Sequence, residues 1–456
     1  MSYLPLKFRT LGAAGCLALV VAVGACSSGS SANGSANSGV VTVAVVSNPL
    51  ITGQMIPLTK SVFEKLYPGI TVKFATYTEG DLRAAIEKDV STHSNAFNVI
   101  MIGNYETPLF AKNGWLDDLS KMFIAKQPSY NAGDFLPPIA KALSYRGDLY
   151  AVPFYGESSM LYYRKDLFAK AHLTMPLHPT WAQVQSFAAR LNQAGKMSGI
   201  CLRGLAGWGD NMAALDTVVN TFGGQWFNMA WQPQLTSPAF TQATNFYVNL
   251  IRKYGEPGAS NDSFNQLLTL YGQGKCAMWY DATVAATSIA GSFPSVFAQT
   301  GYAFAPVDLT KSSGWLWTWS LGIPQGASDQ AAAWKFVSWA TSKSYDQLVA
   351  QKYGWAAVPP GTRTSLYNTP GYQQAAKAFA GITLASIDSV DPLHPTLHPA
   401  PYVGIQFVDI PQFESLGLLV AQQIAGAIAG TETVAQALKA SQTDASAYTP
   451  AQLSGG

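Results

Sequence analysis

The sequence predicts an α/β fold, because short apolar stretches of strand length alternate with amphipathic helical stretches. Residues 40–46 form a continuous run of Val, Thr and Ala, and 70–75 and 97–102 are further apolar stretches. Such runs are typical of buried parallel strands. The intervening segments 57–67 and 81–90 repeat apolar residues at helical spacing. Strand–helix–strand order predicts a sheet with right-handed crossovers.

Start and stop signals delimit the predicted helices. The first helix is expected to end before Pro68, which cannot continue it, and to place Leu66 on its inward face. Another helix is expected to begin at 166–168. The next begins at Trp181, where the hydroxyl of Thr180 is a suitable N-cap.

The length of the chain predicts two lobes, because residues 40–456 exceed what one hydrophobic core usually holds. Apolar strands are predicted at 149–154 and 160–163, and a second α/β lobe is expected to run from there to about residue 305. The last stretch, 441–456, is polar and rich in small residues. We expect it to be a flexible C-terminal tail.

The N-terminal segment has the pattern of a bacterial export signal. Lys7 and Arg9 precede an apolar run at 11–23, and small residues stand directly before Cys26. The run is shorter than the ~20 residues of a transmembrane helix. We therefore predict a lipoprotein signal peptide at 1–25, followed by lipidated Cys26 and a flexible tether, together 26–39, that hold the protein on the outer face of the cytoplasmic membrane. An uncleaved anchor or an ordinary secretory signal is the alternative.

The charge balance excludes an electrostatic nucleic-acid binder. The chain has 28 basic and 26 acidic residues, and loss of 1–25 removes two basic residues and no acid, which leaves 26 of each. A neutral chain has no basic surface for nucleic acid or for anionic lipid. The acyl chains on Cys26 would be the membrane attachment.

Two cysteines, Cys201 and Cys276, remain after Cys16 leaves with the signal and Cys26 takes the lipid. In an oxidising compartment we expect a disulfide between them, and two separate buried thiols are the alternative. No CxxC motif or Cys/His spacing indicates a zinc site.

Polar and aromatic residues follow the predicted strands. Asn48, Glu79, Tyr105 and Glu106 come after the first three strands. Ligands on open α/β sheets bind beyond the carboxyl ends of the strands. These residues therefore indicate a binding site, although ordinary loop polarity is the alternative.

Several segments together carry a family resemblance. The stretches 148–156 and 160–168 resemble the lobe crossover of extracellular solute-binding proteins, of the carbohydrate-uptake family of ABC importers. Further segments resemble the sorbitol/mannitol-binding branch of that family, namely 199–204, 207–212, 219–224, 274–279, 281–284, 359–365 and 402–407. The resemblance extends over nearly all of the chain from about 40 to 440.

The resemblance implies a fold and a set of partners. The fold would be the periplasmic-binding-protein-like fold of type II, with discontinuous lobes joined by a hinge that closes on the ligand. Lobe one would comprise 40–153 with 316–355, and lobe two 154–315 with 356–440. The family carries cysteine at both positions of the expected disulfide, which supports it. The partners would be two permease subunits and their ATPase, served by a monomer.

A linear sugar alcohol makes definite demands on its site. Each hydroxyl buried without a partner costs ~1–3 kcal/mol. Carboxylates accept hydrogen bonds, Arg and Asn donate them, and aromatic rings cover the C–H faces. The residues of these types that we expect at the site are Asn48, Glu79, Tyr105, Glu106, Tyr155, Glu157, Trp208, Asp210, Asn211, Trp279, Asp281, Trp315 and Arg363.

Some candidates have an equally ordinary structural alternative. Trp315 belongs to an alternating Trp row that can also fill a core or a hinge. Glu157 lies directly after the hinge strand and can fix it. Asp281 can cap a helix, and Arg363 can pair with a carboxylate instead of touching ligand.

The sequence shows no enzyme signature. It lacks G-x-S-x-G, H-E-x-x-H, the P-loop and the dinucleotide fingerprint. Glu106, Glu157 and Asp210 are carboxylates of the kind that glycosidases use, but nothing sets their separation. We therefore predict a polyol-binding protein without catalysis, metal or cofactor. A binder of mono- or oligosaccharides, or a surface scaffold lipoprotein, is the alternative.

Overall fold

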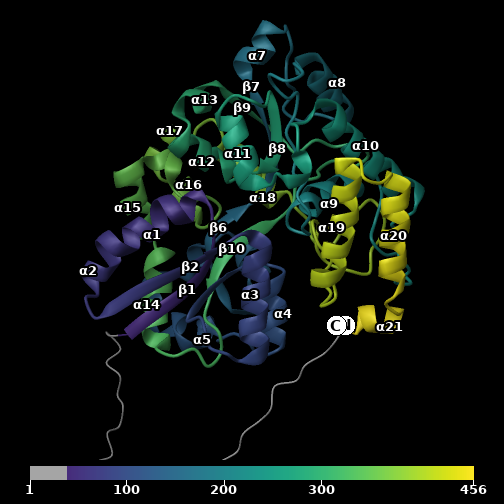
Figure 1. Ribbon diagram of the computed structural model, residues 1–456. Coiled ribbons are helices and arrows are strands. Elements are labelled where there is room, and N and C mark those ends of the chain that lie inside the picture. Colours follow the sequence, from purple (N-terminus) through teal and green to yellow (C-terminus); the bar gives the residue numbers. More distant parts are fainter. Residues whose placement is uncertain (1–38, 456) are drawn as a thin grey trace, which may run out of the picture. The chain divides into compact units, whose positions relative to one another are not determined.

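The computed structural model describes residues 39–455 (Figure 1). The predicted signal peptide and the predicted lipidation site at Cys26 lie outside the described residues. Lobe 1 denotes here the larger sheet with the helices packed on it, and lobe 2 the smaller sheet with its helices. The residue boundaries expected for the two lobes stay a prediction.

The sheet of lobe 1 has five strands in the order β2-β1-β3-β10-β6. Strand β1 is parallel to β2 and β3, as the strand–helix alternation predicts, whereas β10 is antiparallel to β3 and β6. Val41, Val43 and Val45 of β1 are completely buried, which explains the continuous β-branched run. The bounds are β1 (Gly39–Val46), β2 (Ile70–Tyr77), β3 (Val99–Ile102), β6 (Ala151–Glu157) and β10 (Trp317–Gly322).

The sheet of lobe 2 has three antiparallel strands in the order β8-β7-β9, and Figure 1 shows it above the larger sheet. The bounds are β7 (Ser159–Arg164), β8 (Met278–Ala282) and β9 (Thr300–Phe304). Strand β6 of the larger sheet continues into β7 after Ser158 alone. The chain therefore crosses between the sheets along an extended segment, as the sequence predicts, and crosses back before β10.

The first helix is longer than expected and alternates between α- and π-helical turns. It comprises η1 (Ile51–Met55), α1 (Ile56–Leu58), η2 (Thr59–Phe63) and α2 (Glu64–Leu66). Leu58 and Phe63 are buried, but Leu66 is 60% exposed, so its predicted inward position is wrong. A π-turn holds more residues than an α-turn, so it rotates the face that follows out of the 3.6-residue period.

The other helices surround the two sheets. Thr180 caps α8 in a reciprocal capping box with Gln183, which confirms the predicted helix start. The bounds are α3 (Glu79–Thr92), α4 (Glu106–Lys112), α5 (Leu119–Met122), α6 (Pro137–Ala142), α7 (Lys165–Lys170), α8 (Trp181–Leu191), α9 (Asn211–Thr221), α10 (Pro238–Tyr254), α11 (Phe264–Gly272), α12 (Ala285–Ser292), α13 (Pro294–Gln299), α14 (Gln330–Ala340), α15 (Lys343–Tyr353), α16 (Thr364–Tyr367), α17 (Pro370–Ala375) and α18 (Ala380–Asp388).

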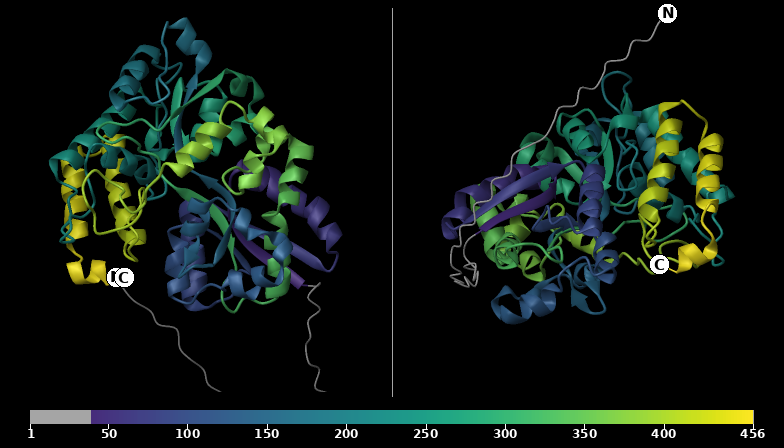
Figure 2. Two further views of the ribbon diagram at one scale, coloured as in Figure 1. Left: turned by 180° about the vertical axis from the view of Figure 1, so that it is seen from behind. Right: turned by 60° about the horizontal axis from the view of Figure 1, so that its bottom comes forward.

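The C-terminal segment is helical and packed, so the flexible tail predicted at 441–456 is wrong for residues 441–454. Helices α19 (Phe413–Ala429) and α20 (Val434–Ser446) lie side by side, and α21 (Pro450–Ser454) follows (Figure 2). Ser441, Ala445 and Leu453 are buried. The small residues that suggested disorder instead permit close helix packing. Thr449 adds a capping box to α21.

No helix within residues 39–455 is long and apolar enough to cross a membrane.

Truncating Leu453 to Ala should destabilise the protein by roughly 2–5 kcal/mol, the usual cost of emptying a buried leucine site, because this side chain is 1% exposed. Leu66→Ala is the matched control, and it should change the free energy of unfolding by less than about 1 kcal/mol. Urea unfolding measures both. Equal decreases in the free energy of unfolding for the two variants would contradict the packing of the C-terminal segment.

Candidate functional site

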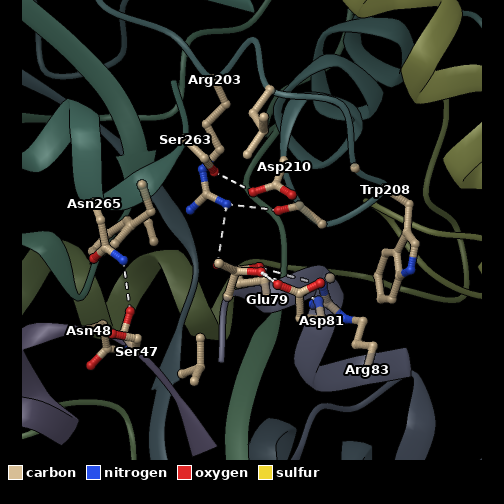
Figure 3. A pocket seen from close by; sticks show the side chains of 18 of the residues that line it. Ser47, Asn48, Glu79, Asp81, Arg83, Arg203, Trp208, Asp210, Ser263 and Asn265 are labelled. Carbon is tan, nitrogen blue, oxygen red and sulfur yellow. Dashed lines mark hydrogen bonds and ion pairs between the residues drawn. The ribbon is translucent and has the colours of Figure 1, made fainter. Parts of the chain in front are cut away.

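A pocket of about 540 Å³ lies between the lobes, lined by residues of both (Figure 3). From lobe 1 it receives the loop after β1, the start of α3 and the end of β6. Lobe 2 contributes the loop before α9 and the first turn of α11. Segments far apart in the sequence therefore build one site. Its polar and aromatic lining includes Asn48, Glu79, Arg83, Tyr155, Glu157, Arg203, Trp208, Asp210, Ser263, Asn265, Trp319 and Glu414.

The parallel strands β1 and β2 bring their carboxyl ends to this pocket, as expected for an open α/β sheet. Asn48 follows β1, accepts the amide N–H of Ile51 at 3.1 Å and donates to the Tyr155 hydroxyl at 2.9 Å. Thr78 caps α3 after β2, so Glu79 stands in the first turn of that helix and projects into the pocket. These contacts hold Asn48 and Tyr155 in place.

Arg203 is fixed by a buried carboxylate behind the pocket wall. Its Nε donates to both Asp281 oxygens at 3.1 and 3.0 Å, and its Nη2 donates to Oδ1 at 2.6 Å. Asp281 is completely buried and also accepts from Trp279 Nε1 at 3.1 Å. Burial alone would lower the pKa of Arg203, but the Asp281 carboxylate raises it, so the guanidinium stays charged.

Arg83 is the corresponding cation of lobe 1. Its Nε donates to Glu106 Oε1 at 3.1 Å, and its guanidinium carbon lies 4.1 Å from the centre of the Trp208 ring. Trp208 Nε1 in turn donates to Glu414 Oε2 at 2.8 Å. The cation–π contact joins α3 of lobe 1 to the loop of lobe 2, and α19 contributes its carboxylate to the same cluster.

The glycines beside Trp208 allow this close approach. A Cβ atom on Gly209 would lie 2.6 Å from Arg83 Nη1, and one on Gly207 would lie 2.2 Å from an oxygen of Asp210. A larger residue at either position would therefore force the Arg83 guanidinium or the Asp210 carboxylate to shift. The Asp210 carboxylate also accepts a hydrogen bond from the Ser263 hydroxyl.

Glu79 lies between the two arginines, 3.6 Å from Arg83 Nη1 and 3.9 Å from Arg203 Nη1. Burial nevertheless raises the pKa of Glu79 to about 7, because desolvation outweighs the attraction of Arg203 and of Arg83. Burial likewise raises the pKa of Glu414 to about 7. Glu79 and Glu414 are therefore poised to exchange protons near neutral pH.

Glu157 is a polar group of the pocket lining whose hydrogen bonds are incomplete. It is 5% exposed, and its Oε2 is buried without a hydrogen-bond partner. Burial raises its pKa well above the ordinary value, and nearby Glu79 adds to this effect against the opposing pull of Arg203. A buried carboxyl group without a partner costs free energy in the empty protein, so an incoming hydroxyl would complete it.

Asn265 and Ser47 meet across the pocket. The Asn265 side chain, from α11, donates to the carbonyl oxygen of Ser47 at 2.7 Å (Figure 3). Together with the Arg83–Trp208 contact, this bond holds the two lobes against each other. The two lobes are therefore in contact beside the pocket.

The predicted site residues fall into three groups. The pocket is lined by Asn48, Glu79, Tyr155, Glu157, Trp208 and Asp210. A supporting layer lies outside this lining and touches it, namely Tyr105, Glu106, Trp279, Asp281 and Trp315. Direct ligand contact of that layer stays a prediction, because these residues support the lining rather than belong to it. Its charges are already paired and its rings are packed.

Two predicted site residues lie away from the pocket. Arg363 is 1% exposed and donates to the carbonyl oxygens of Tyr130, Asn131 and Thr341, so it ties the segment after α15 to residues of lobe 1. Asn211 is completely buried and donates to Ala421 O of α19 at 2.9 Å. Both satisfy backbone carbonyl groups, a role that residue type alone cannot reveal.

The sequence analysis missed several lining residues, above all Arg83, Arg203, Ser263, Asn265 and Glu414. Arg203 lies within a segment that carried the family resemblance, which was the available signal. Arg83 and Glu414 lie within helices and have no local motif. Trp319 lines the pocket directly, whereas Trp315 borders a smaller space of about 20 Å³ behind it.

The donor set suits a neutral, hydroxyl-rich molecule. Carboxylates, two guanidinium groups and indole rings surround the pocket, and no group of three or more His, Cys, Asp or Glu residues within 39–455 is arranged for a metal ion. The expected disulfide between Cys201 and Cys276 is present in the structure. It lies behind the same wall that carries Arg203.

The comparisons agree with this class of site. The family model for bacterial extracellular solute-binding proteins matches residues 48–347. The chain is 44% identical over 407 residues to the mannitol-binding protein of Pseudomonas aeruginosa, covering 88% of this chain and 91% of that protein. The chain therefore belongs to the bacterial extracellular solute-binding protein family.

Solved structures share the fold. A solute-binding protein from Agrobacterium vitis with bound D-mannitol superposes with a TM-score of 0.87 at 48% identity, covering 90% of this chain and 97% of that one. A solute-binding protein from Agrobacterium radiobacter in complex with ribitol has a TM-score of 0.77 at 21% identity, covering 89% of this chain and 98% of that one. This likeness is evidence for the fold alone. The predicted periplasmic-binding-protein-like fold of type II is thus confirmed.

Replacing Arg363 with Met should destabilise the protein by about 3–5 kcal/mol, because three buried carbonyl groups and Asp134 lose their partner. The ligand affinity of the folded fraction should not change, since Arg363 does not line the pocket. Arg190→Met, at an exposed arginine of α8, is the control. Unfolding and titration measure the two effects, and an unchanged stability would contradict the structural role.

The raised pKa of Glu79 predicts a pH dependence of stability. Below pH 4.5 the group is protonated in both states, so it has no effect there. As the pH rises from 4.5 to about 7, the unfolded chain releases the proton first and stability falls. The upper bound of this loss is roughly 3 kcal/mol. Glu79→Gln should reduce the difference in unfolding free energy between pH 4.5 and pH 7.5, as measured by chemical unfolding. An unaltered pH profile would contradict the raised pKa of Glu79.

Proposed function

We propose that this protein captures a linear sugar alcohol of the mannitol type in the pocket and delivers it to an ABC importer. The observation that carries the proposal is Glu157, a buried carboxyl group with an unpartnered oxygen inside a pocket that two lobes share. A hydroxyl group both donates and accepts, so it satisfies such a group whether or not the carboxyl is protonated.

The remaining lining residues fit the same ligand. Arg203 keeps free N–H groups beside Glu79, which supplies an acceptor, and Asp210 adds another. The indole of Trp319 offers an apolar surface to the C–H groups between the hydroxyls. A neutral chain of hydroxyls meets both donors and acceptors here without introducing a charge.

The relatives support this chemistry. The Pseudomonas protein is described as mannitol-binding, and the structure from Agrobacterium vitis contains D-mannitol. Both are more than 40% identical to this chain over most of its length. We therefore favour a hexitol ligand.

Capture proceeds by closure of the lobes about the β6–β7 crossing. The lobes are assigned to 40–153 with 316–355 and to 154–315 with 356–440. Ligand bound between Glu79 and Arg203 links the two, and the Asn265–Ser47 hydrogen bond then adds to the closed state. The closed monomer docks on two permease subunits served by an ATPase, and no catalytic step is involved. Cys26 carries the acyl anchor on the outer face of the cytoplasmic membrane.

Thermal unfolding of the protein from residue 27 onward, with a panel of polyols and ring sugars, tests the proposal. Ligand at 100 times its Kd adds ~2.7 kcal/mol to the folded state, so hexitols should raise the unfolding temperature. A rise with pyranoses alone would replace the polyol by a saccharide. No rise with any compound would overturn the transport function in favour of a surface scaffold.

Glu157→Leu should separate binding from stability. The variant removes an unpartnered buried carboxyl group, so the ligand-free protein should unfold at the same or a higher temperature. Its Kd for D-mannitol should rise at least ~5-fold, since a ligand hydroxyl that loses its buried partner costs ~1–3 kcal/mol. Glu87→Leu, at an exposed position of α3, is the control. Lower stability with wild-type affinity would mean that Glu157 fixes the hinge and does not bind ligand.

A further inference from the structure

The disulfide joins two segments that also pair through isolated backbone bridges. Residues 198–201 run beside β8 and form isolated parallel bridges, Ser198 with Cys276 and Cys201 with Trp279. The backbone hydrogen bonds are Ser198 N to Lys275 O, Ala277 N to Ser198 O and Cys201 N to Met278 O, at 2.8–3.0 Å. This pairing consists of isolated bridges and not of a regular strand ladder, and the covalent link between Cys201 and Cys276 adds a further constraint on its register.

Each linked segment carries one member of the ion pair behind the pocket. Arg203 stands two residues after Cys201, and Asp281 stands five residues after Cys276. The two side chains meet through three hydrogen-bond contacts between 2.6 and 3.1 Å. A shift of one segment along the other would therefore move the guanidinium relative to its carboxylate.

The hydrogen-bond count of Arg203 shows what this positioning achieves. A guanidinium has five N–H groups. Nε and one N–H of Nη2 bond Asp281, and one N–H of Nη1 bonds Gly209 O at 2.8 Å. Two N–H groups remain, on a residue that lines the pocket beside Glu79 and Glu157. Their direction is set by Asp281.

We propose that the Cys201–Cys276 disulfide and Asp281 are positioning elements of the binding site, which hold Arg203 so that its two free N–H groups face the ligand. The proposal rests on the polyol-binding function proposed above. Both sulfur-bearing residues are completely buried, so the link is a permanent part of the folded site and not a switch that a soluble reductant reaches.

Stability alone does not test this proposal. A disulfide that spans 75 residues stabilises a fold by restricting the unfolded chain, whatever it does for a site. The informative quantity is the coupling between the disulfide and Arg203 in ligand affinity. A double-mutant cycle measures it.

The cycle compares wild type, Cys201→Ser/Cys276→Ser, Arg203→Lys and the combined variant, by calorimetric titration with D-mannitol below the unfolding temperature of each. The lysine side chain keeps a positive charge beside Asp281. Loss of the disulfide should raise Kd roughly 10-fold in the wild-type background, as loss of a supporting contact does elsewhere. In the Arg203→Lys background, loss of the disulfide should change Kd less than about 2-fold, because the guanidinium that the disulfide positions is already absent.

Two results would overturn the proposal: an equal loss of affinity in both backgrounds, or no loss in either. Leu250→Ala, in α10 of lobe 2 and completely buried, is the control for lost stability, and it should leave Kd unchanged. Asp281→Asn should raise Kd as the disulfide variant does, since it weakens the same contact to Arg203.

A second measurement needs no ligand. Hydrogen exchange in the ligand-free protein should be faster in the double-Ser variant at residues 201–205 and 277–282, and unchanged in β1 of lobe 1. Unaltered exchange at 201–205 would overturn the positioning role. If the wild-type protein binds no polyol, the proposed function fails, while the exchange experiment still decides whether the disulfide fixes the Arg203 segment.

Discussion

Burial of Arg203 against Asp281 is the interaction on which the pocket depends. A guanidinium and a carboxylate removed from water tolerate burial only when they face each other with their hydrogen bonds satisfied. Here Asp281 accepts from Arg203 and from Trp279, and the two segments that carry the pair are linked by the disulfide. This rigid pair places a positive charge at the wall of a pocket that also contains several acids. Glu79 of the opposite lobe lies within 3.9 Å of it.

Burial of several acids in this pocket explains why a bound ligand would stabilise it. The acids Glu79, Glu157 and Glu414 all have raised pKa values because burial penalises their charge. Glu157 keeps an oxygen without a partner. Unsatisfied groups of this kind lower the stability of a fold and are tolerated where function requires them. A hydroxyl group of a ligand would supply the partner that this oxygen lacks.

Close packing between lobes adds a second constraint. The Trp208 ring is covered by Arg83 on one side and meets the edge of Tyr105, at a centre-to-centre distance of 5.1 Å. Its indole N–H is bonded to Glu414. The C-terminal helix α19 therefore belongs to the site as well as to lobe 2. No local motif in the sequence around Glu414 indicated this contribution.

Local patterns in the sequence determined the strands β1, β2, β3, β6 and β7, the α/β class, the cap at Thr180 and the loops that deliver Asn48 and Glu79. These features follow from periodicity and from the chemistry of single residues, which neighbours in sequence decide. The length of the chain predicted two lobes, and the family resemblance supplied their fold. The tertiary structure decided the rest, because burial and pairing depend on residues far apart in the chain. Arg363 and Asp281 were expected at the ligand, yet carbonyl groups of lobe 1 hold the first and Arg203 holds the second. A carboxylate or guanidinium in a sequence shows what it can bind, and only its neighbours in space decide whether that partner is the protein or the ligand.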